Sequence, residues 1–182
     1  MGRNFGTGQG FTTNHGITMG RWAGIGLVAL AALQITACAT PEPVNAALPS
    51  LYWPMTSQGA QVDAATARDM ISAYRARSGL PPLRLDPDLQ KLAEAEAAGM
   101  AAADRPSRAQ NVKNAVERLG FAGAEANLSA GYHTLAEAFS GWRDSPAHNA
   151  ALLAPQGQRM GIATAYAPGS KYKVYWALLV TK

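Results

Sequence analysis

Hydrophobic residues in the middle of the chain recur at helical spacing in three successive segments. The first covers residues 63–78, where an apolar stripe repeats at i, i+3, i+4 and i+7. The second runs from Pro87 to about Ala103, because Asp86 offers an N-cap and proline suits the first helical position. The third ends at Gly120, and its apolar positions are Val112, Ala115, Val116 and Leu119. The pattern predicts three helices before any long strand.

The period changes in the second half of the chain. Residues 128–132 predict a short strand, and Thr134 with Glu137 forms a capping box for a fourth helix. A short helix is expected from Ser145-Pro146 through Leu153.

The last twenty-three residues of the chain contain two stretches in which apolar positions alternate with polar or small ones. Residues 160–166 and 172–180 flank a turn at 168–170, which predicts an antiparallel hairpin. The second of these strands is apolar on both faces, as expected for a central strand. We therefore predict an α+β fold, an α-β-α sandwich in which helices cover both faces of a small antiparallel sheet.

The amino-terminal region differs in composition from the rest. Residues 22–37 form an uncharged run that follows Arg21, shorter than the roughly 20 residues a membrane-spanning helix needs. Such a run predicts a cleaved export signal, and Met19 then makes a suitable start. The expected organisation is a signal region over 1–37, a flexible tether over 38–62 and one folded domain over 63–182.

The junction before Cys38 resembles the lipobox of bacterial lipoproteins, in which the cysteine is acylated after cleavage. Cys38 is the only cysteine, so it has no partner for an internal disulfide. The resemblance implies membrane lipid as a partner through acyl chains of the palmitate type. Because Ala39 rather than an aspartate follows Cys38, it also implies an outer-membrane location facing the periplasm.

Charge does little to define a partner. The chain has 182 residues, 48% of them hydrophobic, with a net charge of +4. Residues 38–182 contain 14 basic and 12 acidic side chains that are scattered rather than clustered, which argues against nucleic acid as a partner. We expect a monomer.

Common catalytic signatures are missing from the sequence. It contains no G-x-S-x-G elbow, no phosphate-binding loop and no H-E-x-x-H motif. Two segments remain as candidates for chemistry, residues 127–131 and 142–148.

These two segments, with four others in order, resemble the CAP superfamily of cysteine-rich secretory, antigen 5 and pathogenesis-related proteins in its bacterial, SCP-like extracellular form. The matching stretches are YRARSGLPPL at 74–83, residues 89–100, ERLGF at 117–121, ANLSAG at 126–131, WRDSPAH at 142–148 and MGI at 160–162. The resemblance covers residues 66–180 and implies the fold predicted above.

The family's cleft commonly carries two histidines and two acids that hold a divalent ion. Only His148 matches, because residues 104–108 contain no histidine and Ala126 occupies the position of one acid, with Glu125 one place earlier. A zinc site normally needs three or four ligands. We therefore expect no cofactor, with zinc the alternative.

Each candidate residue has two interpretations. His148 either holds its loop through a backbone carbonyl or contacts a ligand, and Asp144 either orients His148 or faces solvent. Ser145 is either the N-cap of its helix or a nucleophile, whereas Glu125 and Asn127 are candidates to line the cleft. Hydrolysis needs at least two positioned groups. The residues thus favour a membrane-anchored envelope lipoprotein whose degenerate CAP domain acts as a binding or structural module. The alternatives are a peptidase-like or wall-directed hydrolase using His148, and a carrier of lipid or sterol.

Overall fold

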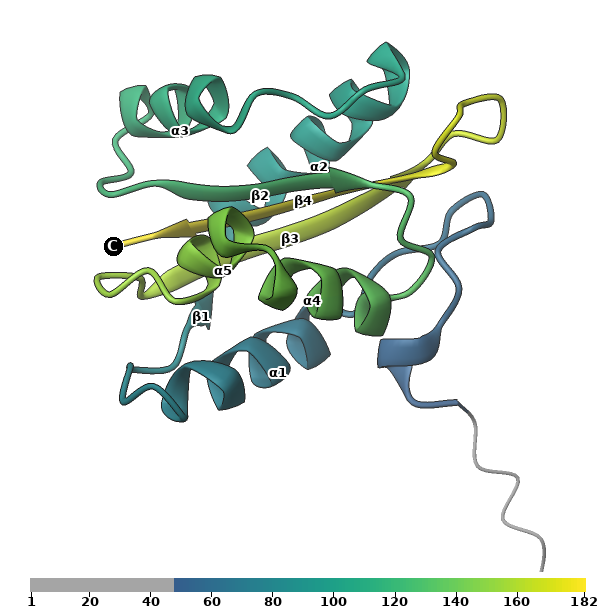
Figure 1. Cartoon of the computed structure of the whole chain (residues 1–182). Helices are drawn as coiled ribbons and strands as arrows, with labels where there is room; N and C mark the ends of the chain where they lie inside the picture. The colour runs from purple at the N-terminus through teal and green to yellow at the C-terminus, as the bar shows by residue number, and fades with distance from the viewer. Residues whose placement is uncertain (1–47) are drawn as a thin grey trace, which may run out of the picture. The chain divides into compact units, whose positions relative to one another are not determined.

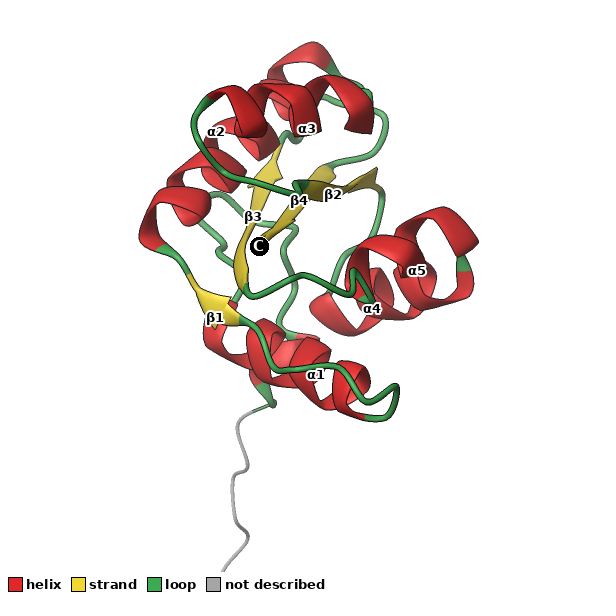
Figure 2. Ribbon diagram, turned by 90° about the vertical axis from the view of Figure 1, so that its left-hand side faces the viewer, coloured by secondary structure: helices red, strands yellow, loops and turns green. Residues whose placement is uncertain are grey.

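The computed structural model describes residues 48–182, and the predicted signal and Cys38 lie outside them. The described chain forms three layers (Figure 1). Helices α2 (Pro87–Ala103) and α3 (Ala109–Arg118) cover one face of a central sheet. The opposite face is covered by α1 (Ala64–Ala76), α4 (Leu135–Asp144) and α5 (Pro146–Leu152), as the view in Figure 2 shows. The predicted α+β sandwich is confirmed.

The sheet contains β1 (Arg84–Leu85), β2 (Glu125–Ala130), β3 (Arg159–Tyr166) and β4 (Val174–Thr181). Their order is β1-β3-β4-β2, so the doubly apolar β4 lies centrally, as its sequence predicted. The sheet is mixed rather than purely antiparallel, because the two-residue β1 pairs in parallel with β3. β4 pairs antiparallel with both of its neighbours.

Side-chain caps place the helices where the sequence predicted them. Asp63 accepts hydrogen bonds from the amides of Ala65 and Thr66 at the start of α1, and Asp86 caps α2 in the same way. At α4, Thr134 Oγ1 accepts from the Glu137 amide at 3.2 Å. The Glu137 carboxylate accepts from the amide of His133 rather than from that of Thr134, so the capping box is shifted by one residue.

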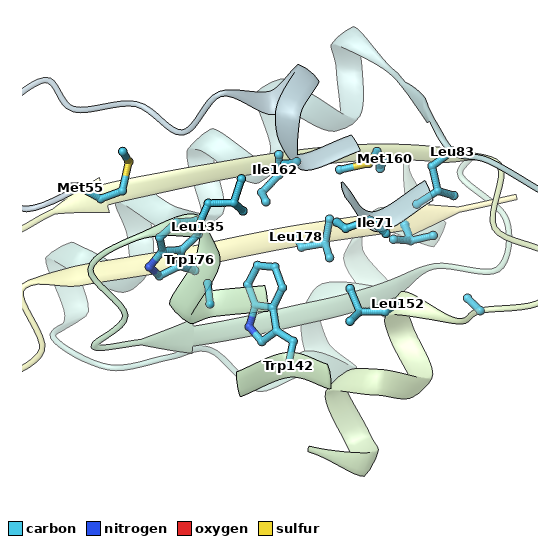
Figure 3. Close-up of a cluster of buried hydrophobic side chains, with 14 of the residues drawn as sticks. Met55, Ile71, Leu83, Leu135, Trp142, Leu152, Met160, Ile162, Trp176 and Leu178 are labelled. Atoms are coloured by element: carbon cyan, nitrogen blue, oxygen red, sulfur yellow. The ribbon is translucent and has the colours of Figure 1, made fainter. Parts of the chain in front are cut away.

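Two hydrophobic clusters fill the sandwich. The cluster beneath α1, α4 and α5 contains the edge-to-face pair Trp142 and Trp176, with ring centroids 6.1 Å apart (Figure 3). The cluster beneath α2 and α3 contains Leu89, Met100 and Leu179. Leu119, which the apolar stripe of α3 placed inward, is 62% exposed because α3 ends one residue before it.

Arg75 forms hydrogen bonds to backbone carbonyls at one end of the first cluster. Its buried guanidinium donates to the carbonyl of Pro81 at 3.0 Å and to that of Gly157 at 2.9 Å. It also donates to the carbonyls of Leu152 and Ala154, at 2.9 and 3.0 Å. One side chain of α1 thus holds the loop between α5 and β3.

The folded domain begins earlier than the expected boundary at residue 63. A 3₁₀ turn, η1 (Ser50–Tyr52), packs against α4 and α1, and Met55 is only 2% exposed. The segment 48–62 is therefore part of the domain and not of a tether. Within residues 48–182 no helix is long and apolar enough to cross a membrane.

Candidate functional site

Strand β2 presents two buried polar side chains to the layer that contains α4 and α5. Ser129 Oγ accepts a hydrogen bond from Trp142 Nε1 at 3.0 Å. Asn127, fully buried, donates from Nδ2 to the backbone carbonyl of His148 at 2.9 Å. These two contacts tie the segments around 127–131 and 142–148, which sequence analysis had singled out, to each other.

His148 lies in the first turn of α5 and is partly buried. Burial lowers the pKa of its imidazole below the usual 6.5, so the ring is neutral at neutral pH. Its Nδ1 is buried and has no hydrogen-bond partner within the described part of the chain. The expected bond from this ring to a backbone carbonyl is thus not made at Nδ1.

Asn127 Oδ1 is the second buried polar atom of this junction without a partner among residues 48–182. Unpaired buried polar atoms are costly, by about 1–3 kcal/mol each, and are usually met by water or a ligand. Asn127 Oδ1 and His148 Nδ1 therefore each retain unused hydrogen-bonding capacity.

The neighbouring candidates do not form a catalytic set with His148. The Asp144 carboxylate is 68% exposed and pairs with Arg143 at 3.3 Å, as the solvent-facing interpretation expected. Ser145 occupies the N-cap position before Pro146, but its side chain makes no capping bond. Neither residue forms a hydrogen bond with His148 within residues 48–182.

Glu125, expected in the cleft, is instead engaged by α3. Its Oε2 lies 2.9 Å from Lys113 Nζ at the first position of β2. Residues 48–182 contain no group of three or more histidine, cysteine or acidic side chains able to hold a metal ion. The residues present at this site therefore do not fit the zinc ion that the family's cleft suggests.

Sequence reasoning missed two supports of the site. Tyr74 of α1 donates its hydroxyl proton to Asn149 Oδ1 at 3.0 Å, which positions the residue after His148. Ser129 anchors Trp142, as described above. Small polar residues in a short strand gave no signal of burial, because isolated serine and asparagine are common on surfaces.

A groove between α2 and α3 was also not anticipated. A cavity of about 680 Å³ lies between these helices at their connecting loop. Arg105 and Arg108 line it together with Glu96, Asn111 and Val112.

A second hollow of about 190 Å³ is mostly apolar and shares Glu96, Val112 and Ala115 with the first. Leu92, Val116 and the exposed Leu119 line the rest of its wall. Glu96 Oε1 is buried there without a partner in the described chain. The groove is thus basic at its loop end and apolar at its other end.

These features define a class of protein: an α+β sandwich domain in which a histidine-bearing helix packs against a short edge strand. The sequence model of the cysteine-rich secretory protein family, CAP, matches residues 68–180 of this chain. The chain therefore belongs to the CAP family. Comparison with curated proteins gives no match.

Solved structures share the fold at low identity. An outer surface protein from Borrelia burgdorferi has 19% identity and a TM-score of 0.57, and the match covers 69% of this chain and 98% of that one. An extracellular SCP-domain protein from Bacillus anthracis has 20% identity and a TM-score of 0.54, covering 65% and 39%. A cysteine-rich secretory protein from Staphylococcus aureus has 16% identity and a TM-score of 0.53, covering 64% and 37%. The chain spans less than two fifths of the length of these last two proteins.

Proposed function

We propose that this protein is exported, anchored to the cell envelope through acylated Cys38, and uses its CAP domain as a binding module. Export is supported by the uncharged run before Cys38, and two solved relatives are described as extracellular or outer surface proteins. Anchoring is supported by the lipobox-like junction at the only cysteine. Each acyl methylene buried in a bilayer contributes about 0.8 kcal/mol to membrane binding, so two or three acyl chains hold a protein durably on a bilayer.

The observation that carries the binding role is the composition of the His148–Asn127 junction. Two buried acceptor or donor atoms there have no partner, whereas the nearby carboxylates of Asp144 and Glu125 are paired with Arg143 and Lys113. Acid–base hydrolysis needs at least two groups positioned on the substrate. A site with one neutral imidazole and one amide oxygen is better suited to holding a ligand hydroxyl than to cleaving a bond.

Fractionation of expressing bacteria tests the anchor. Wild-type protein should be found with membranes and should incorporate labelled palmitate, whereas Cys38→Ser should be unlabelled and released. Ser57→Ala is a matched control, since this exposed serine lies outside the lipobox. A Cys38→Ser variant that stays membrane-bound would contradict acyl anchoring.

Zinc uptake by the purified full-length protein tests the binding role against metal-dependent hydrolysis. We expect negligible uptake by both wild type and His148→Ala, because the site lacks further ligands. His133→Ala is the control, since that histidine is exposed and belongs to another segment. Stoichiometric uptake that is lost only in His148→Ala would support the enzyme alternative instead.

The α2–α3 groove favours a second function, binding of an amphiphile with an anionic head. Its arginines lie at one end and its apolar wall at the other, which matches a phosphate or carboxylate joined to an alkyl chain. Dodecyl phosphate is a suitable probe in calorimetry. Arg105→Glu should weaken its binding, and Arg77→Glu, which changes an exposed arginine outside the groove, should not. Equal affinities in all three proteins would refute this candidate.

A further inference from the structure

Three large apolar side chains are exposed together at the start of the described chain. Leu48, Tyr52 and Trp53 are 63%, 52% and 45% exposed. Trp53 Nε1 donates to the carbonyl of Leu48 at 2.8 Å, which brings the two ends of this segment into contact. We call Leu48, Tyr52 and Trp53 the aromatic patch.

The segment that carries the patch is fixed to the domain. Ser50 Oγ donates to Asp63 Oδ2 at 2.8 Å, and Leu51 packs against the cluster beneath α1 and α4. The amide of Met55 donates to the carbonyl of His133 at 2.8 Å. In Figure 1 this turn lies beside α4 and α1. The patch is thus held outward by a rigid base, and its exposure does not come from a loose end.

The chemistry of the patch suits the boundary between lipid headgroups and acyl chains. Tyrosine and tryptophan are enriched at that boundary because they combine an apolar ring with a polar tip. The indole N–H of Trp53 is already satisfied by Leu48, so its ring enters an apolar phase without an unpaired donor. Residues 43–62 include no Asp, Glu, Lys, Arg or His, so contact with a bilayer would desolvate no charge of this segment.

The position of the patch along the chain limits its distance from the proposed anchor. Leu48 follows Cys38 by ten residues, and a fully extended chain of that length spans at most about 36 Å. The other exposed large apolar side chains with comparable exposure, such as Leu119, belong to elements far from residue 48 in sequence. The patch is therefore the part of the described domain that is tied most closely to Cys38.

We infer that the aromatic patch is a membrane-contacting surface, on which the domain rests against the phospholipid interface. This inference rests on the proposed acyl anchor at Cys38. The anchor keeps the protein on the membrane, and the patch determines which side of the domain faces it. The α2–α3 groove belongs to the layer on the other face of the sheet from α1 and α4, against which η1 packs.

Tryptophan quenching by brominated lipid tests the patch. The full lipidated protein is extracted in detergent and reconstituted into phosphatidylcholine vesicles with bromine on the upper acyl carbons. Trp142 and Trp176 are buried, so quenching should come from Trp53. Three of the four tryptophans lie beyond Cys38, so quenching should remove up to about one third of the emission.

Trp53→Phe should lose this quenchable fraction, and the double variant Leu48→Ser with Tyr52→Ser should reduce it at least twofold. The matched control is Leu119→Ser with Tyr172→Ser, which removes an equally exposed leucine and an exposed tyrosine elsewhere and should leave quenching unchanged. Quenching that is absent in wild type, or that persists in Trp53→Phe, overturns the inference. So does an equal loss of wild-type emission in vesicles of unbrominated phosphatidylcholine, because the loss would then not report contact with the bromine.

Palmitate labelling of the same samples separates the two proposals. An acylated wild-type protein without Trp53 quenching refutes the patch and leaves the anchor standing. A protein that is not acylated refutes the anchor, and with it the role inferred for the patch.

Discussion

Replacing Arg75 by methionine should destabilise the domain more than any other single change to its charged residues. The side chain is fully buried and donates four hydrogen bonds to carbonyls of Pro81, Leu152, Ala154 and Gly157, at 2.9–3.0 Å. Burial lowers the pKa of the guanidinium, but arginine stays protonated in proteins because its ordinary value is so high. Each bond therefore involves a charged donor.

The magnitude follows from those four bonds. Hydrogen bonds to charged groups contribute about 1.5–3 kcal/mol each, but bonds from one side chain are not additive. Methionine fills much of the volume but leaves three buried carbonyls, and the partly buried one of Pro81, without this donor. We therefore expect a loss of about 3–5 kcal/mol. A domain of this size is stable by about 5–15 kcal/mol, so the loss removes a large fraction of its stability.

Urea unfolding followed by the emission of Trp142 and Trp176 measures the effect, since both rings lie in the core that Arg75 closes. Arg75→Lys keeps the charge but has only three donors on a compact ammonium, and should lose an intermediate amount. Arg77→Met, at an exposed position two residues away, should change the free energy of unfolding by less than about 0.5 kcal/mol. A loss below about 1 kcal/mol for Arg75→Met would refute the structural role assigned to these bonds.

Three further predictions concern packing and pH. Gly161→Ala should cost about 1–3 kcal/mol in urea unfolding, because its Cβ would collide with the backbone of Leu89 and Gln90 where α2 crosses β3, whereas Gly169→Ala meets no atom and should be neutral. Hydrogen bonds from Thr66 and Ser50 hold the pKa of Asp63 at about 2. The contribution of this carboxylate to the free energy of unfolding should therefore be complete above about pH 4 and lost as the pH falls towards 2. Asp63→Asn should abolish that pH dependence. Burial lowers the pKa of His148, so the free energy of unfolding should decrease as the pH falls below 6.5. His148→Gln should flatten this dependence on pH. The same dependence in His148→Gln and in wild type would contradict the prediction.

Much of the fold was predictable because its signals are local. Proline and aspartate at the start of α2, the acid before α1 and the alternation of β3 and β4 each act over a few residues. The two-residue β1 gave no periodic signal, because its residues join the sheet only through parallel pairing with β3. The exposure of Leu119 was missed because an apolar stripe does not show where the helix ends.

The candidate site was predicted only in part. The segment that ends in His148 was found, and Asn127 was placed beside it, because both belong to stretches that resemble the family. Glu125 forms an ion pair with Lys113 of α3 and was wrongly expected to line the cleft. That ion pair depends on how α3 packs and not on local sequence. Arg75 appeared to be one of several scattered charges, since four carbonyls from distant loops meet it only in the folded chain.

Intact-mass measurement of the protein extracted from membranes tests the central claim most directly. An acyl-anchored CAP protein should begin at Cys38 and should carry the added mass of a diacylglyceryl group, with or without a third acyl chain, on that residue. A mature protein that begins at another residue, or an unmodified Cys38, would contradict the proposal that acylated Cys38 holds the domain on the cell envelope.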